Sequence, residues 1–249
     1  MRRPFTRTAL ALVTLGALLT ETACIREPAR LSAPCGIAVD GSGSGNQKNG
    51  FAAEQEVQRT VVTFLRDKGC RRISFAPIGT ASEGHRCTHG VVDVDPDAGG
   101  TVDREKLRDQ RRVAVRGQAA KLLECIRKDT VSGRGSDVLG GLKVLAKNRP
   151  AGDGTYHLLV ISDFIVSGPE GSLGRKDLST PAKRTAVIRD YANDQGLPDL
   201  SGAEITTAGY GKLFSADAAR MDDFDAFWNE LLITEAKCVA VRPFDKGDQ

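Results

Sequence analysis

The sequence is poor in aromatic residues and carries little net charge. Phenylalanine, tryptophan and tyrosine make up 5% of the 249 residues, while 40% of the residues are hydrophobic. A core must therefore be built mainly from Val, Leu, Ile and Ala, and this hydrophobic content excludes a disordered chain. The formal net charge is only +3, whereas nucleic-acid binding requires a clustered positive face. The sequence therefore predicts a globular protein with no nucleic-acid partner.

A hydrophobic run of the length that spans a bilayer, about 18 residues or more, is also absent. The apolar run Thr8–Leu19 is shorter than that, follows the basic segment Met1–Arg7 and leads to the small residues Thr22 and Ala23. This order is typical of a secretory signal peptide. We therefore expect residues 1–23 to be a signal peptide and the protein to be exported.

Two features of this leader resemble known export signals. Arg2-Arg3 resembles the twin-arginine pattern, which would mean export in the folded state. Ala23-Cys24 resembles the end of a bacterial lipobox, although Glu21 stands where lipoboxes usually carry Leu. The second resemblance implies a lipoprotein, with its lipid on Cys24, at the outer face of the cell membrane. Without that lipid the protein would be secreted.

The chain lacks a Cys-x-x-Cys motif, so a zinc ribbon or a thioredoxin-like redox site has no support. Export favours disulfides. If Cys24 carries a lipid, one of the other cysteines must stay unpaired; if it does not, three pairs can form in many connectivities. The sequence leaves the pairing open. The other cysteines are Cys35, Cys70, Cys87, Cys125 and Cys238.

Segments with strand and helix patterns alternate along the rest of the chain. Residues 156–161 form a nearly continuous apolar run, which suits a strand covered on both faces. Repeated alternation predicts an α/β fold, doubly wound, with a mainly parallel central sheet and helices on both faces. We expect a tether over residues 24–34 and one domain over residues 35–243. The expected strands are 36–39, 72–78, 87–94 (antiparallel to its predecessor), 156–161, 203–210 and 238–241, and the expected helices are 52–68, 103–128, 136–147, 181–193 and 216–235, the last with Ser215 as N-cap.

Oxygen-bearing side chains follow two of these strands and precede one helix. Asp40, Ser42 and Ser44 come directly after the first strand in a glycine-rich turn. Ser136 stands in a glycine loop before a helix, and Asp163 follows the most hydrophobic strand. Ligands bind outside the carboxyl ends of strands in an open parallel sheet, and carboxylate and hydroxyl oxygens suit Mg²⁺, Mn²⁺ or Ca²⁺. Taken alone, residues 41–45 also fit a flexible Gly/Ser linker.

This arrangement resembles the von Willebrand factor A-type domain with its metal-ion-dependent adhesion site. The family's site is written Asp-x-Ser-x-Ser, then a Thr before a later helix, then an Asp that ends a buried strand. This chain has the same order in Asp40, Ser42, Ser44, Ser136 and Asp163, with serine in the place of threonine. The family often has Gly after the last Asp, where this chain has Phe164.

The resemblance implies a fold of this class over about residues 36–241 and a bound divalent cation, usually Mg²⁺ or Mn²⁺. It implies that Ser42 and Ser44 ligate the ion directly and that Ser136 does so directly or through water. Asp40 and Asp163 would act largely through water and through hydrogen bonds to the hydroxyls. One coordination position would be left for an acidic residue of a protein partner.

Other candidate residues favour structural roles. His85, Cys87 and His89 would share one face of a strand and could bind zinc or copper, but a polar hairpin with Cys87 in a disulfide is the simpler interpretation. The basic stretch 104–116 contains interspersed acidic residues, which predicts a solvated helix face. His157 lies too far along its strand from Asp163 to act as a base there.

We therefore expect a binding module, not an enzyme, that uses the cation to bind a carboxylate of a protein partner. Membrane contact is expected only through a lipid on Cys24. Two alternatives stay open: a cell-envelope structural protein with a vestigial site, and a metal-dependent hydrolase with Asp40 as nucleophile or ligand. The sequence has no Gly-x-Ser-x-Gly elbow, which disfavours the hydrolase.

Overall fold

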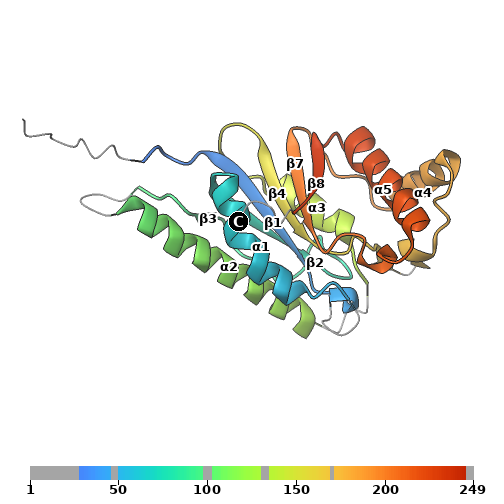
Figure 1. The fold of residues 1–249 in the computed structure, drawn as a ribbon, viewed down its shortest axis with the longest axis horizontal. Helices are drawn as coiled ribbons and strands as arrows, with labels where there is room; N and C mark the ends of the chain where they lie inside the picture. Colours follow the sequence, from blue (N-terminus) through green and yellow to red (C-terminus); the bar gives the residue numbers. More distant parts are fainter. Residues whose placement is uncertain (1–27, 46–49, 98–102, 130–134, 169–170, 245–249) are drawn as a thin grey trace, which may run out of the picture.

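A six-stranded sheet forms the centre of the structure, a computed structural model that describes residues 28–45, 50–97, 103–129, 135–168 and 171–244 (Figure 1). The strand order is β3-β2-β1-β4-β7-β8; β3 is antiparallel to β2, and the other neighbours are parallel. The strands are β1 (Ala33–Asp40), β2 (Cys70–Ile78), β3 (Val92–Asp93), β4 (Tyr156–Ile161), β7 (Ala203–Ala208) and β8 (Ala240–Pro243). The predicted signal peptide and Cys24 lie outside the described residues.

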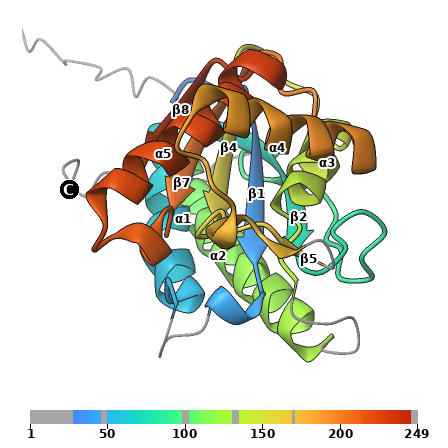
Figure 2. The same cartoon turned by 90° about the vertical axis from the view of Figure 1, so that its right-hand side faces the viewer.

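Helices cover both faces of this sheet, which confirms the predicted fold class (Figure 2). Alternate residues of β4 point to opposite faces: Leu158 and Val160 pack in the core beneath α3, α4 and α5, whereas Leu159 and Ile161 pack in the core beneath α1 and α2. This two-sided burial explains why the strand is apolar at consecutive positions. The helices are α1 (Ala53–Asp67), α2 (Arg104–Lys128), α3 (Val138–Lys147), α4 (Pro181–Asp194) and α5 (Ala218–Asn229).

The predicted boundaries are least accurate after β2 and at the two ends of the domain. The predicted strand 87–94 is wrong in length: only β3, Val92–Asp93, is a strand, antiparallel to β2 as expected, and residues 87–91 form none. Strand β1 begins at Ala33, inside the stretch predicted as a tether. The last helix does not begin after Ser215: the carboxylate of Asp217 accepts a hydrogen bond from Arg220 N and caps α5 instead. The same helix continues as a π-helix over Glu230–Glu235. A short hairpin that the sequence did not predict, β5 (Ser167–Gly168) with β6 (Gly171–Ser172), follows β4.

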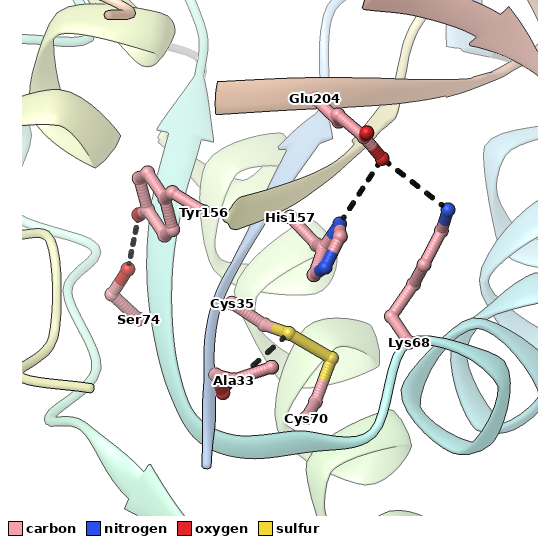
Figure 3. The surroundings of a disulfide bond; sticks show 8 residues. All are labelled: Ala33, Cys35, Lys68, Cys70, Ser74, Tyr156, His157 and Glu204. Carbon is pink, nitrogen blue, oxygen red and sulfur yellow. Dashed lines mark hydrogen bonds and ion pairs between the residues drawn. A yellow bond between two sulfur atoms is a disulfide. The ribbon is translucent and has the colours of Figure 1, made fainter. Parts of the chain in front are cut away.

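Two disulfides close the side of the domain that carries α1 and α2. Cys35–Cys70 joins β1 to β2, as Figure 3 shows, and Cys87–Cys125 joins the segment after β2 to α2. Cys238 is buried and free. Disulfides of this kind are typical of proteins that fold in an oxidising compartment. Within the described ranges, no helix has the length and apolar character needed to cross a membrane.

The basic stretch 104–116 is only in part the solvated face that its mixed charge predicts: Lys106 and Arg111 are exposed, but three arginines are not. The side chains of Arg104, Arg108 and Arg112 are buried on α2. The carboxylate of Asp95, itself 0% exposed, accepts hydrogen bonds from Arg108 at 2.8 Å and from Arg104 at 3.2 Å. It also accepts one from Leu31 N at 2.9 Å, so this buried ion cluster fixes the chain where it enters the domain.

These contacts change the pKa of Asp95. Burial alone would raise it, but the hydrogen bonds from Arg108, Leu31 and Arg104 outweigh burial and lower the pKa to about 2. A carboxyl group with a depressed folded-state pKa stabilises the fold above its unfolded-state pKa, and that stability is lost as the pH falls towards the folded-state value.

We predict that Asp95→Asn lowers the free energy of unfolding at neutral pH by about 3 kcal/mol, because it removes the buried negative charge between two guanidinium groups. The loss should shrink between about pH 4 and pH 2, where the native carboxyl group also becomes neutral. Urea unfolding at several pH values measures both effects. Asp97→Asn, at a carboxylate whose side chain is 85% exposed, serves as the control and should change stability little. An Asp95→Asn loss that stays constant down to pH 2 would contradict this account.

Candidate metal centre

The carboxylate of Asp40 lies at the centre of a network of hydroxyl groups. Asp40 ends β1 and is fully buried. Its Oδ2 accepts hydrogen bonds from Ser162 Oγ at 2.7 Å and from Ser136 Oγ at 2.9 Å. Its Oδ1 accepts one from the backbone N of Ser42 at 2.9 Å. One side chain therefore joins the end of β1 to the end of β4 and to the loop before α3.

The turn after Asp40 brings two more hydroxyls to the same place. Ser42 Oγ and Ser44 Oγ lie 3.0 Å apart, and the Ser44 hydroxyl also bonds the carboxylate of Asp163. Gly41 is required in this turn, since a Cβ at this position would lie 2.6 Å from Ile126 on α2. The segment is thus an ordered turn with a 3-10 helix over Gly43–Gly45, not the flexible linker of the alternative interpretation.

Ser136 is held by the β5 strand. Its backbone N donates to Ser167 O at 2.9 Å, and Ser167 N donates back to Ser136 O at 3.0 Å. The helix predicted to start at residue 136 begins two residues later, because the Asp137 carboxylate accepts from Gly140 N and caps α3. Ser136 therefore stays in the loop, where its hydroxyl reaches Asp40.

Asp163 follows β4 and is 4% exposed. Its Oδ1 accepts a hydrogen bond from Ile165 N at 3.0 Å. The next residue, Phe164, has a φ of 63°, a left-handed conformation that glycine adopts at less cost. Its ring packs edge-on against Tyr210 and Trp228, each at 5.1 Å between centroids, which compensates for that backbone conformation.

Burial raises the cost of ionising both carboxylates, and the charge of Asp40 adds to the cost for Asp163. Burial raises the pKa of Asp40, and the hydroxyl and backbone donors from Ser42, Ser162 and Ser136 only partly offset it. Burial, and then the negative charge of Asp40, raises the pKa of Asp163 to about 6. A buried pair of this kind is stabilised by a cation between or beside its members.

The structure thus brings together all five residues proposed from the sequence, and their role as ligands stays a prediction. Sequence reasoning missed Ser162, which donates to Asp40, and Arg127, which lies within electrostatic range of Asp40 and donates to Gly45 O at 2.8 Å. Ser162 directly precedes Asp163, and in a regular strand the side chains of two neighbours point to opposite faces of the sheet. The sequence therefore gives no reason to expect both side chains at Asp40, and only the bend after β4 brings Ser162 there. The guanidinium of Arg127 is already paired with Glu54.

The donor set fits a hard divalent cation. Three hydroxyls and two carboxylates supply only oxygen, which Mg²⁺, Mn²⁺ and Ca²⁺ prefer. Ser42 and Ser44 are half-buried, whereas Asp40 is fully buried and bonded to Ser136. The two serines are therefore more exposed than the carboxylates of Asp40 and Asp163, whose negative charge is buried.

A second group with metal-binding residues does not have the composition expected from the sequence. His85, Cys87 and Asp129 lie together, whereas His89 packs edge-on against Phe75. Because Cys87 forms a disulfide with Cys125, its sulfur has no thiolate to offer. The disulfide of the simpler interpretation is therefore confirmed, but its hairpin is not, because residues 87–91 form no strand.

No family model, curated protein or solved structure matches the chain. A function must therefore be inferred from the residues of the site and their geometry.

We predict that, in the presence of a chelator, Asp163→Asn raises the free energy of unfolding at pH 7, on the order of 2 kcal/mol, because it removes a negative charge that burial, and then the charge of Asp40, disfavours. Asparagine keeps an Oδ1 acceptor for Ile165 N. Asp199→Asn is the matched control: hydrogen bonds from Ser201 lower the pKa of Asp199, so its neutralisation should not stabilise the fold. Thermal or urea unfolding checks both variants, and a less stable Asp163→Asn would contradict an unfavourable charge at this position.

Proposed function

We propose that this protein is an exported binding module that holds a divalent cation, Mg²⁺ or Mn²⁺ with Ca²⁺ as a third candidate, at Asp40, Ser42, Ser44, Ser136 and Asp163. The cation would serve to bind an acidic group of a protein partner. The observation that carries this proposal is the hydroxyl network around Asp40, which gathers oxygens from three separate chain segments at the carboxyl edge of the sheet.

The division of roles follows from burial. Asp40 accepts hydrogen bonds from Ser136 and Ser162. These bonds fix the orientation of both hydroxyl groups and therefore of their oxygen lone pairs. Ser42 and Ser44 are half-buried and offer neutral oxygens. When bound, a divalent cation supplies an electrophile that exchanges a water for an incoming carboxylate. Because the nearest ligands are neutral hydroxyls, they neutralise little of the cation's charge, so the cation attracts the partner's carboxylate more strongly.

The surroundings favour binding over hydrolysis. His157, at the start of β4, pairs with Glu204, as Figure 3 shows, and lies at the opposite end of that strand from Asp163. It cannot deliver or remove a proton at the oxygen cluster. The family that the site resembles, the von Willebrand factor A-type domain, uses such a cation for adhesion, which supports the same proposal.

The entry point of the chain agrees with a membrane tether. Leu31 is fixed by Asp95, and Ala33 begins β1, whereas Asp40 ends it. Strand β1 thus separates the entry point from the oxygen cluster by about 25 Å at roughly 3.3 Å per residue. We propose that a lipid on Cys24, after removal of residues 1–23, would leave the cation site facing away from the membrane.

We predict that Ser42→Ala and Ser44→Ala each weaken Mn²⁺ binding at least about tenfold, because each removes a proposed ligand oxygen. Isothermal calorimetry with Mn²⁺ measures the affinity. Ser179→Ala is the matched control, since Ser179 forms the same kind of turn with Asp177 on an exposed loop, with a hydroxyl-to-carboxylate distance of 2.7 Å. Unchanged affinity in both site variants would disprove the ion site and leave the structural alternative.

The partner chemistry has its own test. We predict that acetate, as a minimal carboxylate, lowers the water-proton relaxation enhancement of protein-bound Mn²⁺, because it replaces a water on the ion. Acetamide has the same shape without the charge and should have little effect. An equal response to both would show that the site does not select an oxyanion.

A further inference from the structure

Helix α2 contacts both ends of the turn over residues 41–45, which carries two of the proposed cation ligands. At the start of the turn, Gly41 packs so closely on α2 that a Cβ there would lie 2.6 Å from the side chain of Ile126. At its end, Nη2 of Arg127 donates a hydrogen bond to the backbone O of Gly45 at 2.8 Å. Two consecutive residues of one helix therefore hold the turn.

The guanidinium of Arg127 is itself held by Glu54, in the first turn of α1. Its Nη2 donates to Glu54 Oε2 at 3.1 Å, and its Nη1 pairs with Oε1 of the same carboxylate. A forked pair between a guanidinium and a carboxylate fixes the direction of the donors, which a single ammonium group does not. Arg127 therefore joins three segments: the C-terminal end of α2, the N-terminal end of α1 and the turn after β1.

The carbonyl that Arg127 holds is close to the proposed ligands. The backbone N of Gly45 donates to Ser42 O at 3.0 Å, and Phe51 N donates to Ser44 O at 3.1 Å. Gly45 also lies against the end of β1, since a Cβ at this position would come within 3.0 Å of Asp40 O. A shift of the Gly45 carbonyl would therefore move both serines relative to Asp40.

The charge of Arg127 has the opposite effect on a cation at this place. Burial lowers the pKa of Arg127 and the negative charge of Asp40 raises it, so the guanidinium lies within electrostatic range of the site. On charge alone, the removal of Arg127 would tighten the binding of a cation. The carboxylate of Glu54, however, is paired directly with the guanidinium and offsets its field. The gain from removing the charge is therefore small, and the loss of the held turn decides the sign.

We propose that Arg127 is a positioning residue of the cation site: it does not ligate the ion, but it holds the Gly45 carbonyl and, with it, the turn that carries two of the ligands. This inference rests on the proposed function and names a residue on which the geometry of its ligands depends. The role differs from that of a basic residue at the C-terminal end of a helix, where any positive charge is favourable.

Calorimetry of the protein with Mn²⁺ tests the sign of the effect. Arg127→Gln should weaken Mn²⁺ binding about fivefold or more, although it removes a positive charge near the ion. Lys128→Gln is the matched control and should bind as the native chain does, because Lys128 has the same charge in the same turn of α2 and pairs with Glu124 at 2.5 Å. Native or tighter affinity in Arg127→Gln would overturn the positioning role and leave the cation site intact. A native chain that binds no Mn²⁺ would refute the cation site itself, and this inference with it.

Hydrogen exchange in the presence of a chelator shows whether the effect passes through the turn. We expect the amides of Gly45 and Phe51 to exchange at least about tenfold faster in Arg127→Gln than in the native chain. The amide of Leu159, in the centre of β4, should change much less, which verifies that the variant is folded. Weaker Mn²⁺ binding with native exchange at Gly45 and Phe51 would overturn the proposal, since the loss would then not come from the turn. So would an equal increase at all three amides, since Arg127 would then stabilise the fold as a whole.

Discussion

The burial of the Asp40 carboxylate is the constraint on which the rest of the site depends. A carboxylate without exposure to water must be surrounded by donors, and those of Asp40 come from Ser42, Ser136 and Ser162. These donors lie on segments that are distant in sequence, so each bond also fixes a loop. The hydrogen bonds that compensate for the burial of Asp40 therefore also orient the hydroxyl oxygens of Ser136 and Ser162. The arrangement of the candidate site thus follows from the burial of this carboxylate.

The rest of the molecule keeps these segments in place. Leu158 and Val160 bury one face of β4, and Leu159 and Ile161 bury the other, so the end of this strand is fixed from both sides. The chain entry is fixed at the far end of β1 by the ion cluster of Asp95, and the disulfide Cys35–Cys70 ties β1 to β2. Rigid strands with loops at their carboxyl ends are the arrangement on which sites of α/β proteins are built.

The fold class and the placement of Asp40 and Asp163 at one edge of the sheet followed from local patterns, because apolar strands and helical periodicity determine which ends share an edge. The place of Ser136 was expected only from the resemblance to a known family. Contacts between distant residues did not follow. The burial of Arg104 and Arg108 depends on Asp95, which is a neighbour only in three dimensions. Helix α5 is capped by Asp217 instead of Ser215. Both residue types are good N-caps, so the sequence does not decide between them. The unpaired Cys238 and the pairing of the other cysteines likewise required the fold.

Crystals of the protein soaked in Mn²⁺ and measured for anomalous scattering test the central claim most directly. We predict one strong peak bounded by the hydroxyl oxygens of Ser42 and Ser44, with Asp40 behind it. Crystals that retain the hydroxyl network around Asp40 but show no peak there, at saturating Mn²⁺, would contradict the claim.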